Sequence, residues 1–240
     1  MTKTAAQATA ISERIEEVQA KIAAAADRSG RATAEIKLVA VSKTHSASAV
    51  REAIAAGLTD FGENRVQEAE TKVPDVGRDA ARWHLIGHLQ SNKARRAVEL
   101  FDVIHSLDSA ALAERLDRIC VELDRDELPV LIQVDLGHEA AKTGVDEEEL
   151  PGLVKAVAGC SRLRLIGLMT LPPFLEQAEE VRPFFRRLRE LRDGLQRQGA
   201  FGDRLGELSM GMTHDYEIAI AEGATMVRVG TEIFGAREPA

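Results

Sequence analysis

The chain has 240 residues, a formal net charge of -8 and few aromatic residues, and its 31 basic and 39 acidic residues are mixed along the sequence. This charge pattern argues against a nucleic-acid-binding protein, and the two cysteines, Cys120 and Cys160, lack the spacing of a disulfide framework or a structural zinc site. Because no signal peptide and no apolar run of about eighteen residues is visible, we expect a cytoplasmic protein that does not enter a membrane.

The first predicted element is an amphipathic helix over residues 4–28, in which Ile11, Ile15, Val18 and Ile22 recur at helical spacing. Beyond this helix, short apolar runs alternate with helical patterns, several of which open on Ser or Asp and close on Gly. The eight runs read IKLVAVSK, TDFGEN, RWHLIG, FDVIHSLD, LPVLIQVDLG, LRLIGLMTLP, LGELSMG and TMVRVGTEIFG.

Strands that are almost continuously apolar are typical of a parallel sheet covered on both faces, and eight repeats of strand and helix close most simply into a barrel. We therefore predict the α/β class, with a single (β/α)8 TIM barrel over about residues 36–237 that follows the N-terminal helix. Residues 1–240 are expected to form one domain. A doubly wound open sheet is the alternative architecture.

One dense basic cluster interrupts the mixed pattern of charges. It lies in a helical pattern that also carries acidic residues, which favours a solvated helix face over a nucleic-acid patch. Its members are Arg182, Arg186, Arg187, Arg189 and Arg192.

Lys43 ends the first predicted strand, on the same face as Val39 and Val41. In a barrel of this type the chemistry lies at the C-terminal ends of the strands, so Lys43 is expected at the mouth. An amine held in an apolar pocket has a lowered pKa and becomes a nucleophile toward carbonyl groups, which makes Schiff-base chemistry the natural hypothesis. The alternative is a structural lysine that extends its ammonium group to solvent.

The last two predicted strands end in loops where barrels commonly bind phosphate. Ser209, Gly211, Gly230 and Thr231 combine small side chains, hydroxyl groups and accessible backbone N–H groups, and a helix is expected to begin near Thr213. The same residue types are common in ordinary turns, but their occurrence after both strands favours a phosphate site.

Arg228 interrupts the eighth apolar run, where a strand surrounded by helices has little contact with solvent. Pointing inward, its guanidinium group can hydrogen-bond a ring nitrogen or an anion. An aldehyde, a phosphate and a heteroaromatic nitrogen together indicate pyridoxal 5'-phosphate, abbreviated PLP. Asn64, at the end of the second run, is a candidate to lie beside this cofactor, although asparagine at such a position is also a common turn residue.

Three further polar residues lie close to strand ends. His84 and His88 have no carboxylate or cysteine at ligand spacing, so we predict no metal site and assign them packing or supporting roles. Lys142 follows the fifth run, where it is either a mouth residue or an exposed loop lysine.

Five ordered motifs carry a resemblance over about residues 36–237. They are KLVAVSKTH, DFGENRVQEAETK, WHLIGHLQSNK, GLMTLPP and LSMGMTHDYEIAIAEGATMVRVGTEIFGAR. In these motifs the sequence closely resembles the pyridoxal-phosphate homeostasis protein family, whose barrel is similar to the N-terminal domain of alanine racemase.

The resemblance implies that PLP is carried as an internal aldimine on Lys43, with Arg228 facing the pyridine nitrogen and Asn64 beside the cofactor. It also implies a protein that binds and buffers PLP as a monomer, with no catalytic residue, no efficient turnover and apo PLP-dependent enzymes as transient clients. The residues that would surround the phosphate are Ser209, Met210, Gly211, Gly230 and Thr231.

The sequence departs from the family in VDLGHEAAKTG, where an Asn-x-Ser pattern often precedes the glutamate. Lys142 still matches the lysine of the family there, which favours a place at the mouth. The roles of Asp135 and Gly137 are open.

A PLP-dependent racemase of low activity is the alternative. By resemblance to alanine racemase, a histidine is expected where Leu171 stands, together with a C-terminal β-domain that supplies a tyrosine base. Tyr216 is the only tyrosine and is predicted to lie on the helix after the seventh strand, outside the barrel. An arginine opposite the pyridine nitrogen also weakens the ring as an electron sink. A third hypothesis is an aldolase in which Lys43 attacks a phosphorylated substrate directly.

Overall fold

The computed structural model describes residues 2–137 and 143–235. Eight parallel strands follow one another in sequence order around a closed barrel, which confirms the predicted α/β barrel and rules out the open sheet. The last strand pairs with the first, with Arg228 beside Val39 in the register. The strands are β1 Lys37–Val41, β2 Asp60–Glu63, β3 Arg82–Leu85, β4 Val103–Leu107, β5 Leu128–Gln133, β6 Leu163–Met169, β7 Glu207–Met212 and β8 Met226–Val229.

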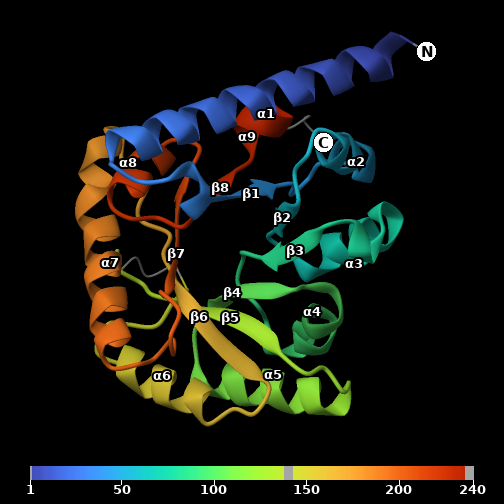
Figure 1. Ribbon diagram of the computed structural model, residues 1–240. Helices are drawn as coiled ribbons and strands as arrows, with labels where there is room; N and C mark the ends of the chain where they lie inside the picture. Colours follow the sequence, from blue (N-terminus) through green and yellow to red (C-terminus); the bar gives the residue numbers. More distant parts are fainter. Residues whose placement is uncertain (1, 138–142, 236–240) are drawn as a thin grey trace.

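Helices connect the strands and cover the outside of the barrel (Figure 1). The N-terminal helix α1 lies across α2, α8 and α9, so it bridges the helices on both sides of the β1–β8 pair. The helix expected near Thr213 begins three residues later. The helices are α1 Thr2–Arg28, α2 Ala47–Ala55, α3 Val66–Val76, α4 Ala94–Leu100, α5 Ala110–Glu122, α6 Leu150–Ala158, α7 Arg182–Arg197, α8 Tyr216–Ala221 and α9 Thr231–Phe234.

Serine caps begin two of these helices, as the sequence predicts. The Ser46 hydroxyl oxygen accepts a hydrogen bond from the N–H of Ala49 at the start of α2, and Ser109 accepts one from Leu112 at the start of α5. Each bond satisfies a backbone N–H that has no partner within the helix. Local sequence therefore sets the point at which the chain turns away from the barrel after β1 and β4.

Side chains alternate between the two faces of the sheet along each strand, so the apolar residues form two separate regions. The larger region lies between the sheet and the helices and includes Phe61 and Trp83, whose ring centroids are 5.8 Å apart. A smaller cluster of Val103, Leu131 and Met169 fills part of the barrel interior, and Val103 lies two residues before the inward-pointing His105 on the same strand. The interior is therefore shared between apolar packing and polar groups.

The arginine cluster on α7 is paired with carboxylates and is not an open basic patch. Arg182, Arg186 and Arg189 all lie within 3.3 Å of Glu222. Arg192 differs from the prediction of a solvated face: it is buried and donates to the carbonyl oxygen of Gly206 at 2.6 Å, because it lies on the face of α7 that packs on the barrel.

Over residues 2–137 and 143–235, no helix combines the length and the apolar character that a transmembrane span requires.

Candidate functional site

The residues predicted for the site lie at the C-terminal ends of four successive strands, β7, β8, β1 and β2. Lys43 occupies the turn after β1 and Asn64 directly follows β2, and both are half-buried. Gly230 and Thr231 follow β8. Because these strands are neighbours in the closed barrel, the structure brings the residues together at one mouth.

The turn that carries Lys43 has an unusual backbone. Thr44 has a φ of 65°, in the left-handed region that β-branched residues rarely adopt. Its N–H donates to Oε2 of Glu68 on α3 at 3.0 Å, and the ring of His45 stacks on Phe234 with centroids 5.1 Å apart. Backbone strain of this kind persists where the surrounding structure holds it, often at functional sites. The turn therefore holds Lys43 in a defined position.

A buried ionic cluster fixes the backbone one residue before Lys43. Nζ of Lys72 lies 2.6 Å from Oε1 of Glu63 and donates to the carbonyl oxygen of Ser42 at 2.7 Å. The Ser42 hydroxyl donates to the same Glu63 oxygen at 2.7 Å. Glu63 is fully buried, and its Oε2 has no hydrogen-bond partner among the described residues. Burial raises the pKa of Glu63, and the ammonium group of Lys72 opposes that rise.

Strands β7 and β8 bring Ser209 and Arg228 into direct contact. Nη1 of Arg228 donates to Oγ of Ser209 at 2.7 Å, and Nη2 donates to the carbonyl oxygen of Thr170 at 2.9 Å. Arg228 is 2% exposed, and burial lowers its pKa to about 10, so the group remains charged at neutral pH. The nearby carboxylate of Asp215 accepts from the N–H of Met212 and forms no ion pair with the guanidinium group in the described part of the chain.

This guanidinium group fits the ligand that the sequence suggests. A buried charge without a counter-ion is costly, and arginine has five N–H donors, of which two are used in these bonds. An acceptor placed in the mouth, such as a ring nitrogen or an anion, would satisfy the others. The donor set is therefore suited to a heteroaromatic, anionic cofactor.

Two glycines at the mouth have no room for a side chain. Gly211 has a φ of 90°, and a Cβ there would lie 2.6 Å from Cβ of Ala219 on α8. At Gly230 a Cβ would lie 3.0 Å from the carbonyl oxygen of Val41. These close approaches hold the loop after β7 against α8 and the loop after β8 against β1. Met210 packs into the core between sheet and helices, which leaves only its backbone for the mouth.

His84 is fully buried inside the barrel, as a supporting residue would be. Its Nε2 lies 2.9 Å from Oδ1 of Asp60, and its Nδ1 lies 2.8 Å from Nε2 of His105. Nδ1 of His105 lies 2.9 Å from Oγ of Ser209. His88 lies apart from this group, with its ring 3.1 Å from the carboxylate of Asp108.

Sequence reasoning missed four participants in these networks, namely Asp60, His105 and the ion pair of Glu63 with Lys72. The available signal for His105 was a polar side chain between the apolar residues of FDVIHSLD, whereas TDFGEN is mostly polar and does not single out Asp60. Lys72 gave no such signal, because lysine is common on exposed helix faces.

Other predicted residues stand as follows. Lys142 lies outside the described residues. Leu171 is half-buried and packs on the interior apolar cluster just after β6. Tyr216 lies on α8 as predicted, and its hydroxyl donates to Oε2 of Glu232 at 3.2 Å. Burial is the main cause of the raised pKa of Tyr216, and the neighbouring carboxylate of Glu232 raises it further.

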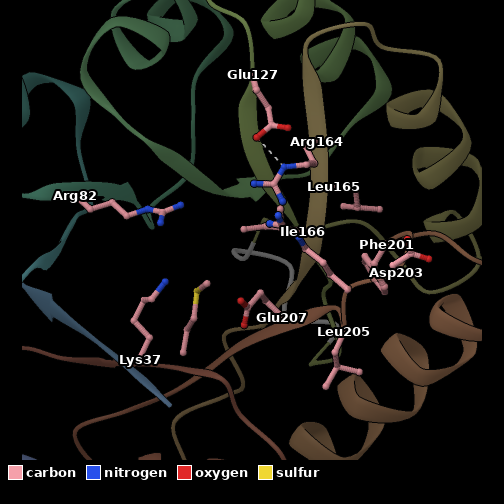
Figure 2. Close-up of a pocket in the computed structure, with 12 residues that line it drawn as sticks. Lys37, Arg82, Glu127, Arg164, Leu165, Ile166, Phe201, Asp203, Leu205 and Glu207 are labelled. Carbon is pink, nitrogen blue, oxygen red and sulfur yellow. Dashed lines mark ion pairs between the residues drawn. The ribbon is translucent and has the colours of Figure 1, made fainter. Parts of the chain in front are cut away.

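A cavity of about 470 Å³ lies at the opposite end of the barrel, among the first residues of the strands (Figure 2). Lys37, Arg82, Arg164 and Glu207 line it, and Arg164 pairs with Glu127 at 2.7 Å. This end of a TIM barrel is associated with stability, so the predicted chemistry is not located here. No group of three His, Cys, Asp or Glu side chains suited to a metal ion occurs within residues 2–137 and 143–235.

Comparison with known proteins places the barrel in a class. The family described as "Alanine racemase, N-terminal domain" matches residues 14–238. An alanine racemase from Corynebacterium glutamicum, 20% identical, has a TM-score of 0.68 over 97% of this chain and 62% of its own, which is a likeness of fold. The class is therefore the alanine-racemase type of barrel.

Relatives within this class are much more similar. A pyridoxal phosphate homeostasis protein from Pseudomonas aeruginosa is 47% identical over 95% of this chain and 96% of its own. PipY of Synechococcus elongatus, solved without PLP, is 44% identical with a TM-score of 0.84 over 94% of this chain and 100% of its own. With PLP bound, PipY is 45% identical with a TM-score of 0.77 over the same shares. The chain belongs to the pyridoxal phosphate homeostasis protein family.

Replacing Lys72 with methionine is expected to destabilise the fold by about 3 kcal/mol at neutral pH, because it leaves Glu63 as an unpaired buried charge. Urea unfolding measures the free energy. The double variant Lys72→Met, Glu63→Gln should recover much of the loss. A single variant as stable as the wild type would contradict a structural role for the pair.

The deficit of Lys72→Met should also depend on pH. The pKa of Glu63 is raised above its unfolded value, so the folded state binds a proton more readily than the unfolded state. Stability from this group is present at low pH and is lost as pH rises through the folded pKa. The deficit should therefore be smaller near about pH 5 than near about pH 8, and a larger deficit at low pH would contradict the assignment.

Proposed function

We propose that this protein binds PLP at the mouth of the barrel, carries it as a Schiff base on Lys43, and buffers or delivers it within the cytoplasm as a monomer without efficient turnover. The observation that carries the proposal is the buried guanidinium group of Arg228, which lacks a paired carboxylate in the described chain and lies one strand from Lys43. The PLP-bound form of PipY, at 45% identity, supports the same cofactor.

Each residue at the mouth has a proposed task. The amine of Lys43 would hold PLP through its aldehyde carbon, and Arg228 would donate a hydrogen bond to the ring nitrogen. The phosphate contacts would come from Ser209, from Thr231 and from backbone N–H groups at Met210, Gly211 and Gly230. Asn64 would lie beside the ring. When bound, PLP supplies an electrophilic carbon and an aromatic ring that can accept electrons.

Several features support a carrier over a racemase. A protonated arginine opposite the ring nitrogen keeps that nitrogen unprotonated, which weakens the ring as an electron sink. Leu171 packs on Val103, Leu131 and Met169 and carries no group able to move a proton. The hydroxyl of Tyr216 donates to Glu232 in the helical layer, and its raised pKa keeps it protonated at neutral pH, so it is not available to accept a proton.

Lys43→Ala is expected to abolish the visible absorption band that appears when the wild-type protein is incubated with PLP, because the variant has no amine at this position. Borohydride should remove the band from the wild type by reducing the C=N bond. Lys155→Ala, which changes an exposed lysine on α6, serves as the control and should retain the band. Equal spectra for Lys43→Ala and the wild type would refute the Schiff base.

Thr231→Glu tests the phosphate site. Thr231 is exposed at the start of α9, so the substitution should be tolerated by the fold. A like charge within a few ångströms of a phosphate should weaken PLP binding by about tenfold or more. Pyridoxal, which lacks the phosphate, should bind wild type and variant equally, and an equal loss for both ligands would place the phosphate elsewhere.

Turnover separates a carrier from a racemase of low activity. The loaded protein in heavy water should exchange the Cα hydrogen of alanine or serine no faster than free PLP does, measured by NMR. Exchange at enzymatic rates would overturn the carrier assignment and favour the racemase.

A further inference from the structure

A continuous chain of hydrogen bonds crosses the barrel interior beneath the mouth. It runs from Asp60 on β2 through His84 on β3 and His105 on β4 to Ser209 on β7 and Arg228 on β8, with four contacts of 2.7 to 2.9 Å. Strands β4 and β7 are not neighbours, so the contact between His105 and Ser209 passes through the interior. We call these five residues the interior relay.

The relay fills a region that barrels usually fill with apolar side chains. Gly62 on β2 has no side chain in this crowded region, where a Cβ would lie 3.1 Å from the side chains of Val39 and Ile86. Burial of an unpaired polar group is costly, and each ring nitrogen of His84 and His105 has a partner within the relay. All five residues are buried.

The two ends of the relay determine its direction. Arg228 has only donors, so it must donate to Ser209. At the other end, burial raises the pKa of Asp60, but hydrogen bonds from His84 and Thr59 outweigh that effect and leave the pKa lowered. Nζ of Lys37 lies 3.9 Å from the same carboxylate, at the end of the barrel opposite the mouth, where Lys37 lines the cavity of Figure 2. Asp60 is therefore an ionised acceptor.

Both histidines between these ends are neutral, because burial lowers the pKa of His84 and lowers that of His105 well below its usual range. A neutral imidazole has one donor and one acceptor nitrogen. Nε2–H of His84 must then donate to Asp60, Nε2–H of His105 to Nδ1 of His84, and the Ser209 hydroxyl to Nδ1 of His105. Every member donates toward Asp60.

We infer that Asp60 is a positioning residue for the PLP site, acting through His84 and His105 to hold Ser209 as an acceptor for Arg228. The inference rests on the proposed function, because PLP binding is what gives the oriented guanidinium group of Arg228 a task, namely to contact the ring nitrogen. This inference revises the task proposed above for Ser209: its hydroxyl hydrogen is committed to His105, so the side-chain contact with the phosphate falls to Thr231, and backbone N–H groups supply the rest. Asp60 thus acts on the mouth across four hydrogen bonds.

The direction of the relay can be measured without any ligand. Long-range ¹H–¹⁵N correlation of protein labelled with ¹⁵N-histidine shows which ring nitrogen carries the hydrogen. His84→Gln and His105→Gln assign the two signals among the six histidines of the chain. Both rings should carry hydrogen on Nε2 alone at neutral pH, and a charged ring or an Nδ1–H form in either would overturn the relay.

The link to the cofactor is tested with Asp60→Asn. The amide group of asparagine can donate a hydrogen bond to His84, which would disturb the tautomers of both histidines. The same substitution has this effect where a carboxylate orients a catalytic histidine. The variant should show mixed tautomers, a shifted absorption band with bound PLP, and a Kd for PLP raised about tenfold, the usual order for loss of an orienting partner. Asp75→Asn, an exposed carboxylate on α3, is the matched control and should behave as the wild type.

The outcomes separate this inference from the proposed function. If the wild type fails to bind PLP, the proposed function is wrong whatever the tautomers are. If Asp60→Asn changes the tautomers but retains the wild-type spectrum and Kd, the relay is only structural and the inference is wrong. Should Asp60→Asn fold poorly by circular dichroism, the same spectrum and Kd measured on His84→Gln decide the question.

Discussion

The need to satisfy one buried guanidinium group organises the interior of this barrel. Arg228 is charged and almost inaccessible, and removing such a group from water costs several kcal/mol unless hydrogen bonds replace the hydration. Ser209 and Thr170 supply two acceptors, and Ser209 is itself held by His105. Polar residues in strands that should be apolar are thus explained together, since each provides the partner that the next requires.

Two networks on opposite faces of the sheet converge on the same mouth. On the inner face, the relay ends at Arg228 of β8. On the outer face, Lys72 and Glu63 hold the backbone of Ser42, directly before Lys43. The two groups proposed to hold the aldehyde and ring ends of PLP are therefore supported by separate networks.

Much of the architecture could be predicted, because parallel strands in a covered barrel leave a strong local pattern. Each of the eight apolar runs contains all or most of a strand, and Arg228 lies within β8, whereas Lys43, expected to end the first strand, lies in the turn two residues after β1. The interior relay could not be predicted in the same way. The contact of His105 with Ser209 joins residues 104 positions apart, and it exists only because closure of the barrel places β4 opposite β7. The buried state of Arg192 likewise depends on how α7 packs.

Closure of the barrel also has a consequence for the order in which the protein is made. The seam between β1 and β8 joins the first strand that leaves the ribosome to the last, and α1 packs on α8 and α9 across that seam. Domains tend to fold as units during synthesis, and contacts this distant in sequence form late. Lys43 is thus translated long before Arg228 exists. A nascent chain would expose the reactive amine without the groups that orient a cofactor, so loading should follow completion of the chain.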